Sequence, residues 1–138
     1  MGDTPGPGTL TVGPVDAAQV LRYADASGDH NPVHLDAAFA QRIGLAGPIV
    51  HGMFVMGQFE RVIHHWVTDH TVEALSVRFT KPVPVGAVLT VQARIAQATP
   101  CEDGRIRTLL RLVASVDRTI VCIGTATLTG PRIEAVSA

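Results

Sequence analysis

Residues 52–67, with the sequence GMFVMGQFERVIHHWV, decide the fold that we expect for this chain. The stretch lacks the strict alternation of apolar and polar residues that a half-buried strand shows, and apolar side chains surround its first two turns. This pattern predicts a helix that is buried on all sides. The only large surface that the sequence offers to cover such a helix is a curved sheet formed by the residues that follow.

Four runs after residue 71 have the composition and period of β-strands. Leu75, Val77 and Phe79 alternate with polar residues, and the same period of two recurs over residues 89–95. Two further runs, at 105–117 and 119–129, are rich in Thr, Val and Ile and meet at the dipeptide Asp117-Arg118. We therefore expect an antiparallel meander of four strands wrapped around the helix.

The residues before the long helix predict a short strand and two small helices. The strand is expected at residues 9–12. Asp16 is a residue type that caps helix N-termini, and the helix that follows it should end before Gly28. Asp36 caps the second helix, which ends at Gly44. The Gly/Pro-rich residues 1–8 are expected to form a loose arm.

The length of 138 residues, 46% of them hydrophobic, fits one domain with a substantial core. We assign residues 9–138 to this domain and place it in the α+β class. Lys and Arg number 11 against 12 Asp and Glu, without a block of like charge, which argues against a nucleic-acid partner. No leader and no membrane span is readable, so we expect a cytoplasmic protein in which Cys101 and Cys122 are free thiols.

The loop SGDHNPVH, residues 27–34, is the candidate site for chemistry. It holds Asp29, Asn31 and His34 within six residues, and Pro32 stiffens it. A carboxylate and an imidazole at this spacing can share one water, and the imidazole titrates near neutral pH. Alternatively, Asp29 and Asn31 only satisfy turn amides and His34 caps the helix that begins after Asp36.

Three motifs in the chain resemble the signature of the MaoC-like, or (R)-specific enoyl-thioester hydratase, family. The first is Gly28-Asp29-x-Asn31-Pro32-x-His34 and the second is Pro48-Ile49-Val50-His51-Gly52-Met53. The third runs from Arg78 to Gly86, with the sequence RFTKPVPVG. The resemblance covers about half of the chain and implies a single hotdog domain. Within the family, the chain resembles 3-hydroxyacyl-carrier-protein dehydratase subunits of the mycobacterial type.

The resemblance implies the hydration of trans-2-enoyl thioesters, or the reverse dehydration. By this resemblance Asp29 and His34 are the catalytic pair that holds the water, and Gly52 donates its backbone N–H to the thioester carbonyl. That role suits the N-terminus of a helix, where amides lack partners and the dipole end is positive. Asn31 is expected to orient Asp29. Coenzyme A or phosphopantetheine enters as part of the substrate, and no metal or other cofactor is implied.

Other residues carry a functional and a structural interpretation side by side. His51 either supports the site or is a hydrogen-bonded structural histidine. Arg78 and Lys81 either contact the phosphates of the thioester carrier or are solvated. His64 and His65 lack a further ligand at metal-binding spacing. The large apolar residues at the start of the long helix either line an acyl tunnel or pack in the core; they are Met53, Phe54, Met56 and Phe59.

The expected partners are an acyl-CoA or acyl carrier protein substrate and a second hotdog subunit. A lone sheet leaves an edge open, so we expect a homodimer, or a heterodimer in which this chain is the catalytic subunit because it holds both Asp29 and His34. Two other enzyme activities compete: a hotdog thioesterase, and addition of a different nucleophile to the enoyl thioester. The third alternative is a non-catalytic acyl-binding or partner-stabilising subunit.

Overall fold

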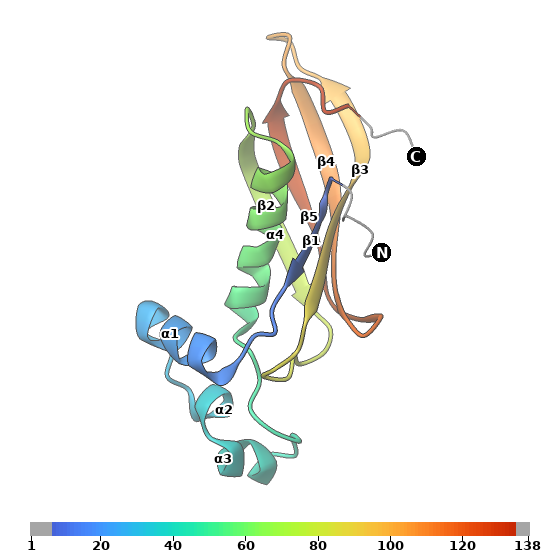
Figure 1. Cartoon of the computed structure of the whole chain (residues 1–138). Helices are drawn as coiled ribbons and strands as arrows, with labels where there is room; N and C mark the ends of the chain where they lie inside the picture. Colours follow the sequence, from blue (N-terminus) through green and yellow to red (C-terminus); the bar gives the residue numbers. More distant parts are fainter. Residues whose placement is uncertain (1–6, 135–138) are drawn as a thin grey trace.

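The computed structural model describes residues 7–134, and in it one sheet carries a long helix along one face (Figure 1). Three short helices lie together at the end of the molecule where the long helix begins (Figure 1). In chain order the elements are β1 (Thr9–Val12), α1 (Ala17–Ser27), α2 (Pro32–Leu35), α3 (Ala37–Arg42), α4 (Gly52–Trp66), β2 (Thr71–Phe79), β3 (Leu89–Pro100), β4 (Ile106–Val116) and β5 (Thr119–Gly130). The predicted α+β class is confirmed.

The five strands are all antiparallel and lie in the order β1-β3-β4-β5-β2. The predicted meander is therefore correct for β3, β4 and β5 but wrong for β2, which pairs with β5 at the far edge instead of with β3. The segment between β2 and β3 contains Pro82 and Pro84, which lack the N–H groups that a tight hairpin would use. Its backbone bonds to the loop before α4 instead, where the Val50 amide donates to the Val83 carbonyl at 2.8 Å.

The helix α4 packs on the sheet through one face only. Val55, Phe59, Val62 and Ile63 are at most 2% exposed and lie in the same core as Leu89, Leu110 and Leu128 of the strands. On the opposite face Met53 is 61% exposed, and the charged and polar residues Glu60, Arg61 and His64 also face solvent. The prediction of a helix buried on all sides is thus wrong for the single chain, because the sheet covers one face of α4.

The short helices begin and end where their local sequence indicates. Asp16 accepts a hydrogen bond from the Gln19 amide at 2.8 Å and caps α1, and Gly28 ends this helix with a φ of 79°. Asp36 caps α3 through the Phe39 amide at 3.1 Å. The four-residue helix α2 was not predicted, since it falls in a stretch of turn-forming residues.

Residues 1–6 of the predicted N-terminal arm lie outside the described residues. Pro7 and Gly8 form a turn, and the Gly8 carbonyl accepts a hydrogen bond from the Ala93 amide at 2.7 Å, which attaches this part of the arm to β3. Within residues 7–134, no helix has both the length and the apolar composition needed to cross a membrane.

Candidate active site

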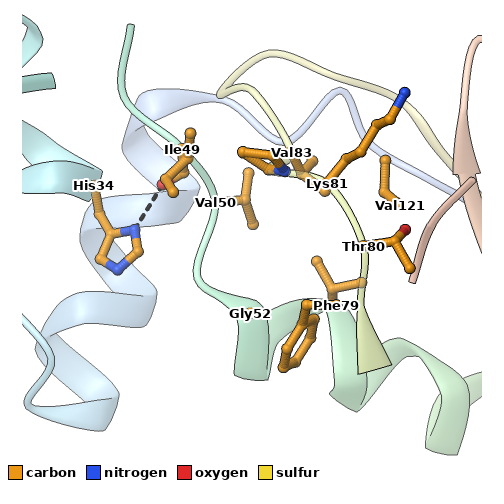
Figure 2. A pocket seen from close by; sticks show the side chains of 11 residues that line it. His34, Ile49, Val50, Gly52, Phe79, Thr80, Lys81, Val83 and Val121 are labelled. Atoms are coloured by element: carbon orange, nitrogen blue, oxygen red, sulfur yellow. Dashed lines mark hydrogen bonds between the residues drawn. The ribbon is translucent and has the colours of Figure 1, made fainter. Parts of the chain in front are cut away.

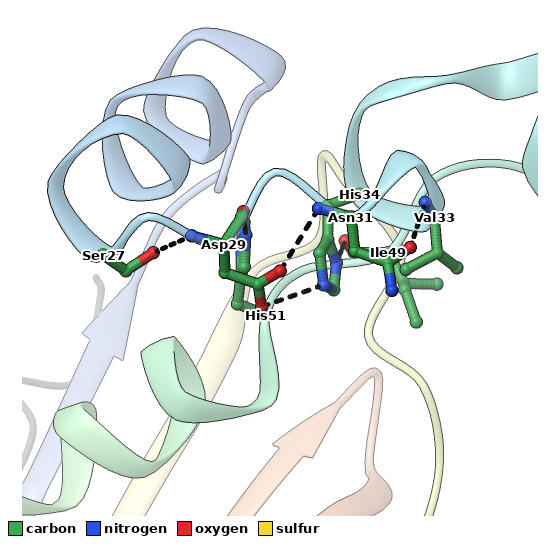
Figure 3. Close-up of polar contacts among 7 residues, drawn as sticks. All are labelled: Ser27, Asp29, Asn31, Val33, His34, Ile49 and His51. Atoms are coloured by element: carbon green, nitrogen blue, oxygen red, sulfur yellow. Dashed lines mark hydrogen bonds and ion pairs between the residues drawn. The ribbon is translucent and has the colours of Figure 1, made fainter.

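A network of turn hydrogen bonds sets the shape of the loop between α1 and α2 (Figure 3). The Asp29 amide donates to Ser27 Oγ at 3.2 Å, and Asp29 Oδ1 accepts from the Asn31 amide at 3.2 Å. Asn31 Oδ1 in turn accepts from the Val33 amide at 3.0 Å and caps α2. Asp29 and Asn31 therefore do satisfy turn amides, as the structural interpretation proposed, but Asp29 uses only one of its two carboxylate oxygens for this. Asp29 Oδ2 takes no part in the turn.

Asp29 Oδ2 lies 3.7 Å from His34 Nε2. This separation is longer than a hydrogen bond, yet an oxygen atom placed about 2.8 Å from both atoms would complete a triangle with them. His34 is largely buried, with 10% of its side chain exposed, whereas Asp29 is 52% exposed. The pair thus has a covered side, at the imidazole, and an open side, at the carboxylate.

The backbone carbonyl of Ile49 fixes the tautomer of His34. His34 Nδ1 lies 2.7 Å from this oxygen, which can only accept, so Nδ1 carries a hydrogen and donates it (Figures 2 and 3). In the neutral imidazole Nε2 is then an unprotonated acceptor that faces Asp29. The Ile49 amide also donates to the Val33 carbonyl at 3.1 Å, so two hydrogen bonds join α2 to Ile49 in the loop before α4.

His51 connects the same loop to the start of α4. Its Nε2 donates to the Asp29 carbonyl at 2.9 Å, and its ring stacks on His34 with 3.8 Å between the ring centroids. His51 is only 2% exposed, and Tyr23 of α1 covers it at a centroid distance of 4.8 Å. His51 therefore touches both the backbone of Asp29 and the imidazole of His34.

A cavity of about 260 Å³ opens beside His34 and the first residue of α4 (Figure 2). Apart from His34, Thr80 and Lys81, its lining consists of Gly52 and apolar side chains: Ile49, Val50, Val55, Phe79, Pro82, Val83 and Val121. Among residues 7–134 the Gly52 amide has no backbone partner, and no side chain caps α4. The cavity therefore joins the imidazole, a helix-terminal amide and an apolar wall.

Phe79 lines this cavity and lies against Gly52. A Cβ atom at position 52 would lie 3.1 Å from the Phe79 ring, closer than an ordinary van der Waals contact. The glycine thus lets the aromatic ring approach the first turn of α4. Phe79 remains 49% exposed, on the open edge of the sheet.

Of the other predicted site residues, only Lys81 lines the cavity at His34 and Gly52. Arg78 lines a different hollow on the sheet. Met53, Phe54 and Met56 do not line the cavity; Met53 is exposed and the Phe54 ring packs edge-on against Tyr23 at 5.5 Å. The residues of α4 that line the cavity are Gly52 and Val55.

Several residues of the site were not singled out from the sequence. Phe79 and Thr80 stand in the third motif, so their position was a usable signal, and Tyr23 lies five residues before the first motif. Ile49 stands in the second motif, but its contact with His34 carried no signal, and neither did Val121, because only the folded chain brings these residues to the site.

His30 lies in the same loop but takes part in a different contact. Its Nε2 is 2.8 Å from Asp25 Oδ1 on α1, and both side chains are exposed. The hydrogen bond to Asp25 raises the pKa of His30 above its ordinary value. His30 is therefore a neighbour of the Asp29–His34 pair without belonging to it.

Asp29, His34 and His51 offer potential metal-ligating atoms within 4.8 Å of one another. The two imidazole rings, however, are stacked with an interplanar angle of 25°. Because the lone pair of an imidazole nitrogen lies in the ring plane, two nearly parallel rings cannot direct their lone pairs at one ion between them. The arrangement suits a water or a substrate oxygen between Asp29 and His34 better than a shared metal.

Comparison with known proteins identifies relatives of the whole domain. The model of the MaoC like domain matches residues 4–112. The (R)-specific enoyl-CoA hydratase of Aeromonas caviae is 32% identical over 117 residues, which are 83% of this chain and 86% of the relative. The 3-hydroxybutyryl-CoA dehydratase of Methylorubrum extorquens is 28% identical over 122 residues, 87% of this chain and 76% of the relative. By contrast, the chain spans only 4% of the fatty acid synthase subunit beta of Gibberella zeae.

Solved structures share the architecture. The (R)-hydratase from A. caviae involved in PHA biosynthesis superposes with a TM-score of 0.80 at 26% identity, covering 94% of this chain and all of that one. The HadBC (3R-hydroxyacyl-ACP dehydratase) complex of Mycobacterium tuberculosis superposes with a TM-score of 0.70 at 20% identity, covering 91% of this chain and 92% of that one. These likenesses confirm the predicted hotdog fold. The chain therefore belongs to the MaoC-like domain family, in which named relatives are hydratases and dehydratases of acyl thioesters.

Proposed function

We propose that this protein reversibly hydrates trans-2-enoyl thioesters to (R)-3-hydroxyacyl thioesters. One observation carries the proposal: His34, whose Nε2 lies 3.7 Å from Asp29 Oδ2, lines a cavity together with Gly52, whose amide has no hydrogen-bond partner among residues 7–134. Two acceptors for a water and one donor for a carbonyl are what addition to a conjugated thioester requires. The named hydratase and dehydratase relatives support the same reaction class.

The water binds between Asp29 Oδ2 and His34 Nε2. Both atoms accept hydrogen bonds when Asp29 is ionised and His34 is neutral, so the water donates one hydrogen to each and directs a lone pair of its oxygen at C3 of the substrate. As the C–O bond forms, one of the pair takes a proton from the water, and the same group then returns this proton to C2, because the other member carries no proton to give. The dehydration uses the same path in reverse, with the same groups.

Gly52 stabilises the enolate that develops on the thioester. Its N–H stands at the first position of α4, where backbone amides lack intrahelical partners and the helix dipole is positive. Donors of this type are typically worth about 2.7–4 kcal/mol of barrier in other enzymes. The apolar wall beyond Gly52, formed by residues such as Val55 and Val121, suits the acyl chain.

Lys81 is the candidate contact for the carrier of the thioester, coenzyme A or phosphopantetheine. It is exposed at the rim of the cavity that contains His34 and Gly52, where an ammonium group can meet a phosphate. The reaction needs no metal or further cofactor, because the protein supplies the two acceptors and the amide donor.

We also propose that the domain pairs with a second hotdog subunit, either a copy of itself or a related chain. The edge strand β2 is open in the single chain, and Phe79 at its end and Met53 on α4 are exposed large apolar residues. Solved structures with this fold include complexes of two different subunits, such as HadBC.

The test of the reaction is loss of the conjugated-enoyl absorbance with a chain-length series of enoyl-CoAs, followed by chiral analysis of the product. Asp29→Asn and His34→Ala should each lower turnover by at least about 100-fold, because each removes one acceptor of the water. The matched control is His30→Ala, a histidine of the same loop outside the pair. Turnover within about tenfold of wild type in both variants would contradict the proposal.

A further inference from the structure

Three arginines surround a hollow on the face of the sheet that is turned away from α4. Arg78 of β2, Arg94 of β3 and Arg111 of β4 line this hollow of about 490 Å³, and all three are exposed. Their direction follows from the strands, because the neighbours Ala93, Leu110 and Leu112 are buried in the core on the side of α4. The hollow shares no lining residue with the cavity at His34.

The strand register brings the arginines together rather than spacing them apart. Arg94 and Arg111 are direct partners across β3 and β4, and the same row continues to Thr125 on β5 and Ser76 on β2. Like charges directly opposite one another destabilise an antiparallel pair. The chain as a whole has a net charge of −1, so this local excess of positive charge does not reflect a basic composition.

No carboxylate compensates the three guanidinium groups. Within residues 7–134 none of them lies at ion-pair or hydrogen-bond distance from Asp or Glu. Arg107, which precedes Arg111 by two outward positions on β4, is by contrast paired with Glu73 at 3.4 Å. The neighbouring arginine thus has a counter-charge from the protein, and the cluster around the hollow does not.

We propose that this hollow binds a small ligand that carries adjacent phosphate groups. A guanidinium presents a planar fork of donors that matches phosphate oxygens, and three such groups fit the charge of a pyrophosphate. The hydroxyls of Ser76 and Thr125 add uncharged donors at the hollow, and Val113 and Ile123 give it an apolar wall. Three arginines in a chain of net negative charge form too small a basic surface for a nucleic acid.

The experiment is calorimetric titration of the full-length protein with inorganic pyrophosphate at low salt. We expect saturable binding that is at least about tenfold weaker in Arg94→Gln and in Arg111→Gln, since each removes a charged donor. Binding should also weaken as the salt concentration rises to 1 M, where the Debye length falls to about 3 Å. Arg107→Gln is the matched control, because this arginine is already paired, and it should bind as wild type does.

Two further arms complete the test. Orthophosphate should bind more weakly than pyrophosphate if the arginines act together on adjacent phosphates. Adenosine diphosphate binding more tightly than pyrophosphate would extend the ligand to a nucleotide whose base contacts the apolar wall. Absence of pyrophosphate binding to the wild type, or equal affinity in the Arg94, Arg111 and Arg107 variants, would overturn the proposal. Enoyl-CoA turnover measured on the same variants reports separately on the proposed function.

Discussion

At the scale of single residues, the proposed site depends on what holds Asp29 and His34 in place. His51 donates a hydrogen bond to the backbone of Asp29 and stacks on the ring of His34, so one buried side chain contacts both members. It touches neither the cavity nor, in our proposal, the substrate. We therefore assign His51 a positioning role.

Replacing His51 separates its two contacts. His51→Phe keeps an aromatic ring beneath His34 but removes the N–H that binds the Asp29 carbonyl, and we expect kcat to fall by about 10–100-fold with a smaller change in KM. His51→Gln restores an amide donor and should recover part of the loss. The measurements are steady-state kinetics with an enoyl-CoA, with thermal unfolding as the control for folding. Wild-type kcat in His51→Phe would contradict the assignment.

The sequence indicated that Asp29 and His34 lie close together, but not the contacts that orient them. Asp29, Asn31 and His34 lie close together in the chain, and turn chemistry predicts their loop. The acceptor for His34 is 15 residues away, at Ile49, and the donor for Asp29 is 22 residues away, at His51. Such contacts depend on how α2 meets the start of α4, which no local pattern specifies.

At the scale of elements, local signals predicted every helix except α2 and all five strands, but they did not predict which strand β2 pairs with. The caps of α1 and α3 use the residues that the sequence indicates, Asp16 and Asp36. Strand β2 has the right period, but its partner is β5 rather than the next strand in the chain. Period two shows that a segment is a strand and does not show which edge it joins.

The two-residue turn between β4 and β5 is an element whose sequence conflicts with its geometry. Asp117 and Arg118 both have positive φ, at 49° and 66°, a conformation that favours Asn and Gly in hairpins. The double variant Asp117→Asn with Arg118→Gly should raise the free energy of unfolding by about 1 kcal/mol. Urea unfolding measures the gain. Arg132→Gly, at a residue without positive φ, is the control and should give no gain.

At the scale of the molecule, the exposed side of α4 and the open edge of β2 indicate how the domain assembles. Met53 is 61% and Phe79 49% exposed, and Phe79 also lines the cavity at Gly52, so a partner that covers this patch would complete the wall of the site. The sequence predicted that α4 would be covered on all sides. The sheet of the single chain covers only one face of α4, and we expect a second subunit to cover the other.

Size-exclusion chromatography of the chain expressed alone tests this assembly. We expect elution at twice the 14.6 kDa mass of one chain. Met53→Glu should shift the protein toward the monomer, because it places a charge in the apolar patch. Leu21→Glu, at a 49% exposed residue of α1, is the control and should leave the elution unchanged. A wild-type chain that elutes as a monomer at every concentration would contradict pairing with itself.

The bond between His34 and Ile49 limits the route that a proton can take through this site. With Nδ1 occupied by a carbonyl at 2.7 Å, the imidazole has a single nitrogen available for exchange, and it faces Asp29. A hydrogen that arrives at His34 must leave from the atom at which it arrived, so the ring serves as a reservoir and cannot relay charge to the far side. In the proposed reaction, any proton that His34 takes up therefore has to return to the substrate or to solvent through Nε2.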